Sequence, residues 1–246
     1  MKILIADKFD ENGRRSLSDN DFECLFEPSL KDDALVAAMS QHQPDVLVVR
    51  STKVTGPAIQ ASASLKLIVR AGAGYDTIDI STASDNGIFV ANCPGKNAIA
   101  VAEIAWAHIL NCDRQISEQT IDIREGKWNK KRYGKAKGLY GRTLGIIGFG
   151  TIAKEVISRA RAFGMNVIVW SRSMTPEKAK EHRVTFAQTP IQVAEVSDVI
   201  SVHVASKPDT KNLISDEFVN AMKEGATLIN TARGAVADET ALMHGV

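Results

Sequence analysis

The sequence has little of what membrane-spanning, disulfide-rich or metal-binding proteins need. Its three cysteines, Cys24, Cys93 and Cys112, lie far apart without CxxC or metal-ligand spacing. No apolar run approaches the roughly 20 residues that span a bilayer, and the formal net charge is only +1. The first apolar run ends at Asp7, too early for a signal peptide. These features predict a cytoplasmic protein with reduced thiols, no metal, and no membrane or nucleic-acid partner.

Strand-like and helix-like patterns alternate along the chain and are separated by short turns. The composition, 44% hydrophobic and 24% charged, is ordinary for a globular protein, and 246 residues allow two modest domains. This alternation predicts right-handed βαβ units and therefore parallel sheets. We expect strands at 2–7, 22–27, 44–51, 65–74, 87–95, 143–150, 166–170, 197–205 and 227–234. We expect helices at 11–18, 31–41, 97–126, 151–164, 175–183 and 215–225.

One segment, residues 127–142, is basic, spaced by glycines and free of acidic residues. We interpret it as a surface loop between domains. It could help to bind a phosphorylated substrate, although the default for such a loop is a solvated surface. Its aromatic residues are too few for a nucleic-acid platform. The cations are Lys127, Lys130, Lys131, Arg132, Lys135, Lys137 and Arg142.

The stretch LGIIGFGTIA, residues 144–153, holds a G-x-G-x-x-A motif between an apolar strand and a helix. Gly148 permits a sharp turn, Gly150 lets the main chain approach a pyrophosphate, and the small Ala153 lets helix pack on strand. The helix begins at about Thr151, where free amide groups and the helix dipole favour an anion. A purely structural turn is the alternative, but the next strand, NVIVW, follows where a nucleotide-binding fold requires it.

The end of that next strand bears on which nucleotide binds. An NAD site usually has an Asp or Glu there, which accepts hydrogen bonds from the ribose 2′-hydroxyl. This chain has Ser171, Arg172 and Ser173 instead, with no carboxylate. Arg172 can face a 2′-phosphate and the serines can hydrogen-bond to it, which favours NADP over NAD. The alternative is a solvated Arg172, with NAD held by its other contacts.

Several separated stretches match one protein family in consistent order and spacing. They are VVRSTKVT (48–55), VRAGAGYDTID (69–79), GIFVANCPGKNAIAVAE (87–103), REGKW (124–128), GRTLGIIGFGTIA (141–153), FGMNVIVW (163–170), DVISVHV (198–204) and TLINTARGAVADETAL (227–242). On these residues the chain resembles the D-isomer-specific 2-hydroxyacid dehydrogenases, especially their D-3-phosphoglycerate dehydrogenase branch.

The resemblance implies an α/β fold with two Rossmann- or flavodoxin-like doubly wound parallel-sheet domains. Residues 1–96 would be the N-terminal part of the substrate domain, and 97–246 an NAD(P)-binding domain that is incomplete at its C-terminus. A hydride would pass between the nicotinamide and a small D-2-hydroxy or 2-oxo acid. VRSTKVT and REGKW favour phosphoglycerate, whereas WSRS favours NADPH-linked reduction of glyoxylate or hydroxypyruvate. Family members are commonly homodimers through the nucleotide domain, so we expect a dimer that uses the helix at 97–126.

The resemblance also assigns roles to individual residues. Arg233 in NTARG matches the catalytic arginine, which would pair with the substrate carboxylate and polarise the C2 oxygen. Ala73 and Gly74 match the loop whose amide groups hold that carboxylate. Arg50 and Ser51 match the substrate side of the cleft, where a strand-end ion pair and cap are the alternative. The cofactor-contact positions are matched by Val101, Gly148, Gly150, Thr151, Ile152, Ser171, Arg172, Ser173, His203, Val204, Ala205, Thr210, Thr231, Ala232 and Arg233.

Some of the family pattern is not found. His203 could equally be a packed histidine. The family's catalytic glutamate and histidine lie tens of residues beyond the arginine, whereas the given sequence ends at Val246. The other histidines, His42, His108, His182 and His244, match no catalytic position. We therefore expect a truncated family member that transfers little or no hydride alone; the alternative is a non-catalytic NAD(P)-binding or regulatory module.

Overall fold

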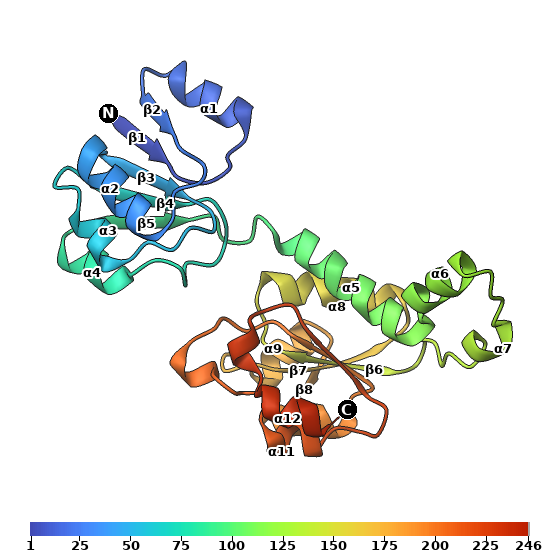
Figure 1. Cartoon of the computed structure of the whole chain (residues 1–246). Helices are drawn as coiled ribbons and strands as arrows, with labels where there is room; N and C mark the ends of the chain where they lie inside the picture. Colours follow the sequence, from blue (N-terminus) through green and yellow to red (C-terminus); the bar gives the residue numbers. More distant parts are fainter. Residues whose placement is uncertain (246) are drawn as a thin grey trace. The chain divides into compact units, whose positions relative to one another are not determined.

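The computed structural model describes residues 1–245. Contacts divide the chain into two compact units, one of residues Met1–Asn97 and one that begins at Ala98. Each unit is built on one five-stranded sheet whose paired strands are all parallel (Figure 1). Within the described residues, no helix is both long and apolar enough to cross a membrane.

The sheet of the first unit has the order β2-β1-β3-β4-β5, the order of flavodoxin-like folds. Its strands are β1 (Lys2–Ile5), β2 (Glu23–Phe26), β3 (Val46–Val49), β4 (Leu67–Arg70) and β5 (Phe89–Asn92). The helices between them are α1 (Glu11–Ser18), α2 (Asp32–His42), α3 (Gly56–Gln60) and α4 (Ile80–Asp85).

The two faces of this first sheet are covered by different helices. Side chains of a strand point alternately to opposite faces. Leu4, Leu47 and Ile68 belong to a core cluster that includes residues of α2, α3 and α4. Ile3 and Ile5 belong to the opposite cluster, which is closed by α1. The branched apolar residues of these strands are therefore buried on both sides, as their unbroken hydrophobic runs predict.

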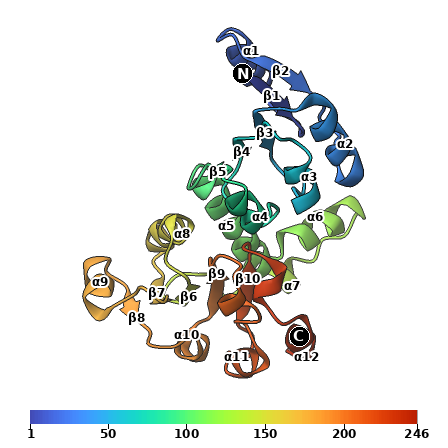
Figure 2. The same ribbon diagram turned by 90° about the vertical axis from the view of Figure 1, so that its left-hand side faces the viewer.

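The sheet of the second unit has the order β10-β9-β6-β7-β8 (Figure 2). When the strands of this unit are numbered along the chain and the sheet is read from β8, the order is 3-2-1-4-5, which is five strands of the dinucleotide-binding order. The strands are β6 (Thr143–Ile147), β7 (Asn166–Trp170), β8 (Thr185–Phe186), β9 (Val199–Val202) and β10 (Thr227–Asn230). The helices after β6 are α8 (Thr151–Ala162), α9 (Pro176–Glu181), α10 (Pro190–Val196), α11 (Asp216–Asn220) and α12 (Glu239–His244), with 3-10 turns at Pro208–Thr210 and Gly234–Val236.

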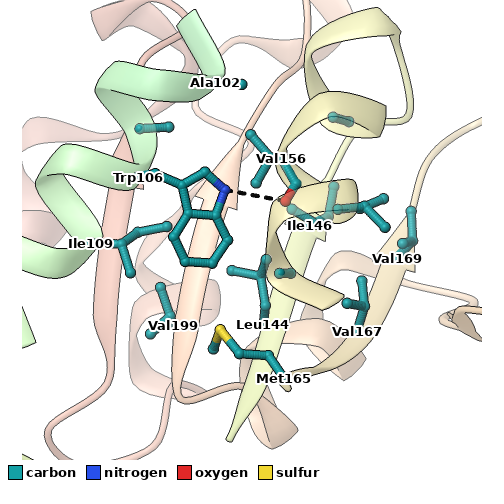
Figure 3. Close-up of a cluster of buried hydrophobic side chains, with 14 of the residues drawn as sticks. Ala102, Trp106, Ile109, Leu144, Ile146, Val156, Met165, Val167, Val169 and Val199 are labelled. Atoms are coloured by element: carbon teal, nitrogen blue, oxygen red, sulfur yellow. Dashed lines mark hydrogen bonds between the residues drawn. The ribbon is translucent and has the colours of Figure 1, made fainter. Parts of the chain in front are cut away.

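Strand β7 illustrates how this second sheet is packed. Val167 and Val169 belong to the core cluster that lies under α5 (Ala98–Arg114) and α8, whereas Ile168 belongs to the cluster under α10 and α11. Trp106 of α5 fills the first cluster, and its Nε1 donates a hydrogen bond to the Val156 carbonyl at 3.2 Å (Figure 3). The indole therefore joins α5 to α8 as well as to the sheet.

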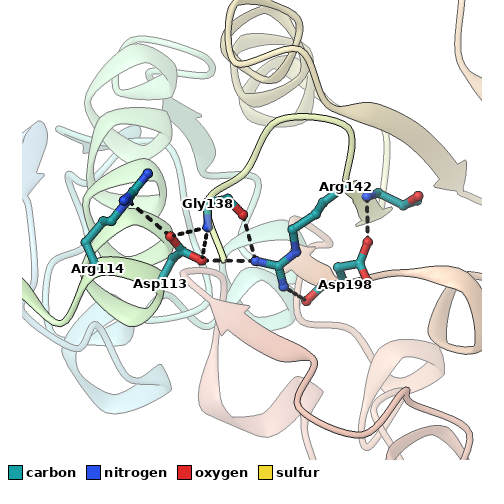
Figure 4. A network of polar contacts seen from close by, with 6 residues as sticks. Asp113, Arg114, Gly138, Arg142 and Asp198 are labelled. Carbon is teal, nitrogen blue, oxygen red and sulfur yellow. Dashed lines mark hydrogen bonds and ion pairs between the residues drawn. The ribbon is translucent and has the colours of Figure 1, made fainter. Parts of the chain in front are cut away.

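A polar network fixes the edge of the second sheet at which its strands begin (Figure 4). The Arg142 guanidinium lies 3.1 Å from the Asp113 carboxylate, which also accepts the Gly138 amide at 3.1 Å. Asp198 accepts the amide of Thr143 at 2.8 Å. The Asp113 side chain is only 6% exposed, so its charge depends on these partners for compensation.

Two predicted elements are wrong in detail. The single helix expected at 97–126 is two helices, α5 and α6 (Ile116–Arg124), separated by Gln115 with a left-handed φ of 52°. The side chain of Asn111 holds this break because its Oδ1 accepts both the amide and the hydroxyl of Ser117, at 2.8 and 2.9 Å. The basic segment 127–142 contains a short helix, α7 (Lys130–Tyr133), and lies inside the second unit instead of between the two.

Other elements lack a prediction because their sequences are short. They include α3, α4, β8 and α10.

Gly145 in β6 explains why α10 can pack so close to the sheet. A Cβ added at Gly145 would lie 2.5 Å from Val193 of α10 and 2.2 Å from the Ser197 hydroxyl. Only glycine lets that helix end approach the strand so closely.

Candidate functional site

The glycine turn joins β6 to α8 in a conformation that a side chain would block. Gly148 has a φ of +101°, and a Cβ added there would lie 2.5 Å from the His203 carbonyl oxygen. Gly150 is the N-cap of α8 and provides no side-chain cap for the first amide groups of the helix. A Cβ at Gly150 would meet no heavy atom within 4 Å, so the main chain is open there. These features suit the approach of an anionic group to the helix N-terminus.

A cavity of about 350 Å³ opens over this turn. It lies where β6, β7 and β9 end, which is the edge where α/β folds bind ligands. The sequence predicts most of the lining residues, but not Phe149 and Trp170. The lining residues are Gly148, Phe149, Gly150, Trp170, Ser171, Arg172, Ser173, His203, Val204, Ala205 and Thr210.

Arg172 has an acidic partner that the sequence analysis missed. Its guanidinium is paired with the Asp209 carboxylate. Asp209 lies in the 3-10 turn Pro208–Thr210, far along the chain from β7, so the motif after β7 gave no signal for it. The hydroxyl groups of Ser171 and Ser173 lie 3.5 Å apart beside Arg172.

His203 is a partly buried, neutral member of the cavity wall. Its main-chain amide donates to the Ile147 carbonyl at 2.8 Å, and its Nε2 lies 2.8 Å from the Ser201 hydroxyl. Burial lowers the pKa of His203 to about 4, because the charged imidazolium is poorly solvated there. At neutral pH this ring is therefore uncharged.

Thr210 shapes the loop that closes one side of the cavity. The Lys207 amide donates to the Thr210 hydroxyl at 2.8 Å, and that hydroxyl donates to the Ala205 carbonyl at 2.7 Å. Thr210 is 2% exposed. Its hydroxyl therefore holds the 205–210 loop in place.

The remaining cofactor positions matched by the sequence do not line this cavity. Val101 lies on α5, and Thr151 and Ile152 form the first turn of α8. Residues 231–233 follow the end of β10.

The loop around Arg233 is held by the side chain of Asn230, a residue that the sequence analysis did not single out. The Asn230 Oδ1 accepts the Ala232 amide at 3.0 Å, and its Nδ2 donates to the Arg233 carbonyl at 2.9 Å. The Arg233 Nη1 donates to the Ala232 carbonyl at 2.9 Å. The Oγ1 of Thr231 is buried and has no hydrogen-bond partner among the described residues. Such an orphaned hydroxyl is suited to a ligand.

In the first unit, Asp7 organises the residues that follow β3. Its carboxylate accepts the amides of Arg50, Ser51 and Thr52 at 2.7, 3.0 and 2.9 Å, and the Ser51 hydroxyl at 2.9 Å. Burial raises the pKa of Asp7, but these hydrogen bonds outweigh it and bring the pKa down to about 2. Asp7 is thus an ionised anchor that the sequence analysis missed.

The RAGAG loop after β4 carries Ala73 and Gly74. The Asn92 side chain donates to the Ala73 carbonyl at 2.7 Å, and the Cys93 amide donates to the Gly72 carbonyl at 3.0 Å. A Cβ at Gly72 would lie 1.6 Å from the Arg70 guanidinium, so the loop folds closely over that side chain.

Other potentially reactive groups do not line the cavity. The described residues contain no group of three or more His, Cys, Asp or Glu that could hold a metal. All three cysteines are free. His42 pairs with Glu27 at 2.7 Å in the first unit, and the His182 ring lies 4.9 Å from the Phe149 ring.

A sequence model described as "D-isomer specific 2-hydroxyacid dehydrogenase, NAD binding domain" matches residues 106–246. The chain belongs to this family. The chain is 39% identical over its whole length to the D-3-phosphoglycerate dehydrogenase of Bacillus subtilis, of which it covers 46%. It is also 39% identical to the hydroxypyruvate reductase of Thermotoga maritima, of which it covers 78%. The chain thus spans about half the length of the phosphoglycerate dehydrogenases that it matches.

Solved structures of dehydrogenase relatives have the same fold. A D-isomer-specific 2-hydroxyacid dehydrogenase from Polaromonas superposes with a TM-score of 0.87 at 27% identity, covering 99% of this chain and 77% of that one. An acyclic imino acid reductase in complex with NADPH and D-Arg gives a TM-score of 0.87 at 28% identity, with 99% and 78% covered. The predicted family and the predicted α/β class with two doubly wound parallel sheets are therefore confirmed.

Proposed function

We propose that the chain binds a nicotinamide dinucleotide in the cavity over the glycine turn and serves the oxidation of a small D-2-hydroxy acid or the reverse reduction. The observation that carries this proposal concerns the two glycines before α8. Gly148 has no room for a side chain, whereas the main chain at Gly150, at the N-terminus of α8, is open to a ligand. When bound, the nicotinamide would supply or accept the hydride. The protein's own residues would hold the phosphates, orient the substrate and polarise its C2 oxygen.

The proposed roles divide between the two units. In the second unit, Arg233 would pair with the substrate carboxylate, and Asn230 would hold the Arg233 loop in position. In the first unit, substrate contacts are proposed for the amide groups of Ala73 and Gly74 and for Arg50 and Ser51. Cofactor contacts are proposed for Val101, Gly148, Gly150, Thr151, Ile152, Ser171, Arg172, Ser173, His203, Val204, Ala205, Thr210, Thr231, Ala232 and Arg233.

For the cofactor we propose NADP over NAD, on the strength of Arg172 and its two flanking serines. The acidic partner Asp209 opposes this preference, because a carboxylate repels a 2′-phosphate and can accept a hydrogen bond from a 2′-hydroxyl. The preference is therefore modest, and both nucleotides should bind.

For the substrate we propose 3-phosphoglycerate, or glyoxylate and hydroxypyruvate. The names of the two 39%-identical relatives support both classes. The test follows nicotinamide absorbance with each acid as substrate and with a buffer blank as control. Turnover with an acid that lacks a 2-hydroxy or 2-oxo group, and not with these, would contradict the proposal.

A second candidate is nucleotide binding without chemistry. It is supported by the neutral, partly buried His203, which is poorly suited to exchange a proton near neutral pH. On this second candidate, the 246-residue polypeptide alone binds nucleotide and transfers little or no hydride. Saturable binding without turnover would support this, and turnover above the blank would contradict it.

For assembly we propose a homodimer that uses α5 and α6. Both helices expose large apolar side chains: Ile99 and Ile104 on α5, and Ile116, Ile121 and Ile123 on α6, all between 47% and 56% exposed. Light scattering after gel filtration should give twice the 26.6 kDa of the chain. Ile121→Lys should shift that mass to the monomer, whereas Ile80→Lys, an exposed site in the first unit, should not. A cytoplasmic location without nucleic-acid or membrane partners remains part of the proposal.

A further inference from the structure

A second cavity, of about 190 Å³, lies in the unit that begins at Ala98, at the opposite edge of the sheet from the cofactor cavity. Val199 and Thr227, which line it, are the first residues of β9 and β10. The cofactor cavity is lined instead by Gly148 and His203, which follow the ends of β6 and β9. Strands of four or five residues are roughly 13–17 Å long, so the two cavities are separate sites.

The walls of this second cavity are strongly cationic. They are formed by the junction of α5 and α6, by α7 and the residues after it, and by the residue before β6. Five cations line the cavity against a single carboxylate: Arg114, Arg132, Lys135, Lys137 and Arg142, against Asp113. The net charge of the whole chain is only +1, so this positive charge is a local concentration.

The negative charge of Asp113 is already balanced by two arginines. Asp113 pairs with Arg142 at 3.1 Å and with Arg114 at 3.3 Å (Figure 4). Among residues 1–245, by contrast, no carboxylate forms an ion pair with Arg132, Lys135 or Lys137. The Arg132 guanidinium lies over the Tyr133 ring, 5.4 Å from its centre. Arg132 does act on the Asp122 carboxylate, whose pKa it helps to lower. The cavity therefore has three cations that form no ion pair with a carboxylate of the described residues.

We propose that this cavity binds a phosphate group, either as inorganic phosphate or as part of a small phosphorylated metabolite. Arg132 can give a phosphate two parallel N–H donors, and Lys135 and Lys137 add point charges. The volume is below the roughly 300–1,000 Å³ of sites that enclose a drug-sized ligand. A phosphate group therefore fits the cavity, whereas a dinucleotide does not.

The bound group would join parts of the second unit that are distant in sequence. Lys137 reaches the start of β10, since its Nζ lies 3.8 Å from the position of a Cβ on Gly225. An anion between Lys137, Arg132 and the junction of α5 and α6 would hold the basic segment against the sheet. Phosphate binding would explain why the segment 127–142 is basic and free of acidic residues, which nucleotide binding does not explain.

The test is a titration of the 246-residue chain, followed by amide NMR at constant ionic strength. Inorganic phosphate and glycerol 3-phosphate are the two probes, and the tighter one identifies the source of the phosphate group. The amides of Gly134, Gly138 and Gly225 report on this cavity, and those of Gly148 and Gly150 on the cofactor cavity. Saturable shifts at the first three amides support the proposal. Shifts confined to Gly148 and Gly150, or no saturable shift, overturn it.

Two triple variants, matched in the charge they remove, distinguish a specific phosphate site from a general electrostatic attraction of anions. Arg132→Gln/Lys135→Gln/Lys137→Gln removes the three cations of the cavity that form no ion pair. Lys127→Gln/Lys130→Gln/Lys131→Gln removes the same charge from the same segment outside the cavity. We expect the first variant to weaken phosphate binding at least tenfold and the second to weaken it less than twofold. Equal weakening by both variants would show a diffuse charge effect and overturn the proposal.

Discussion

The Arg172 guanidinium is paired with the Asp209 carboxylate, so the cation that the sequence offers to a 2′-phosphate already has an acidic partner. The two residues come from different turns, one after β7 and the other after β9. Their side chains are 57% and 53% exposed, so the pair contributes little to the stability of the fold. Its importance lies in the choice between NADP and NAD.

Asp209→Asn should raise the affinity for NADPH relative to NADH about tenfold. The substitution removes the repulsion of the 2′-phosphate and frees Arg172 for a charge-assisted hydrogen bond, which contributes about 1.5–3 kcal/mol. Arg172→Gln should lower the same ratio. Both ratios come from fluorescence titrations with the two nucleotides. An unchanged ratio in both variants would mean that this pair lies outside the cofactor contacts.

Asp113→Ala should lower the free energy of unfolding by about 3 kcal/mol. The substitution leaves the largely buried Arg142 without its carboxylate, and breaking such a pair is costly. The control is Glu11→Ala, which removes an exposed carboxylate that pairs with Arg15 and should change stability by less than about 0.5 kcal/mol. Urea denaturation measures both. Similar small losses would contradict the structural role of Asp113.

Acidification should destabilise the chain through His203. The folded-state pKa of about 4 lies below the usual 6.5, so the unfolded chain binds a proton in this range before the folded chain does. The resulting decrease in the free energy of unfolding begins as pH falls through about 6.5 and is complete near pH 4. Between pH 7.5 and pH 5 it amounts to about 2 kcal/mol. Urea midpoints for the wild type and His203→Gln should converge over this range, and a parallel decline would count against the assignment.

The sequence was sufficient to predict the strands other than the two-residue β8, because its apolar runs and glycine turns are local signals. The ends of the long helix were not predictable in this way. The break at Gln115 depends on the Asn111 side chain, which accepts hydrogen bonds from Ser117, six residues later. Propensity alone gave no reason to stop a helix at a glutamine.

The residues of the site likewise fall into those that the sequence predicts and those that it does not. Motif residues such as Gly148 and Arg172 could be placed from the sequence, and the cavity brings them together. Asp209, Asn230 and Asp7 could not be found, because each acts through a contact that only the fold creates. Their common signal is a polar residue at or just after the end of a strand, or within the loop that follows it, which is too frequent a pattern to single out a residue.

The most direct test of the proposed nucleotide site compares the wild type with Gly150→Ala. Gly150 has a φ of −93°, which any residue can adopt, and the added Cβ would occupy open space. The variant should therefore keep the unfolding free energy of the wild type within about 0.5 kcal/mol. Energy transfer from tryptophan to NADH and NADPH should show saturable binding to the wild type and at least tenfold weaker binding to the variant. Equal affinities, or a folded wild type that binds neither nucleotide, would contradict the account.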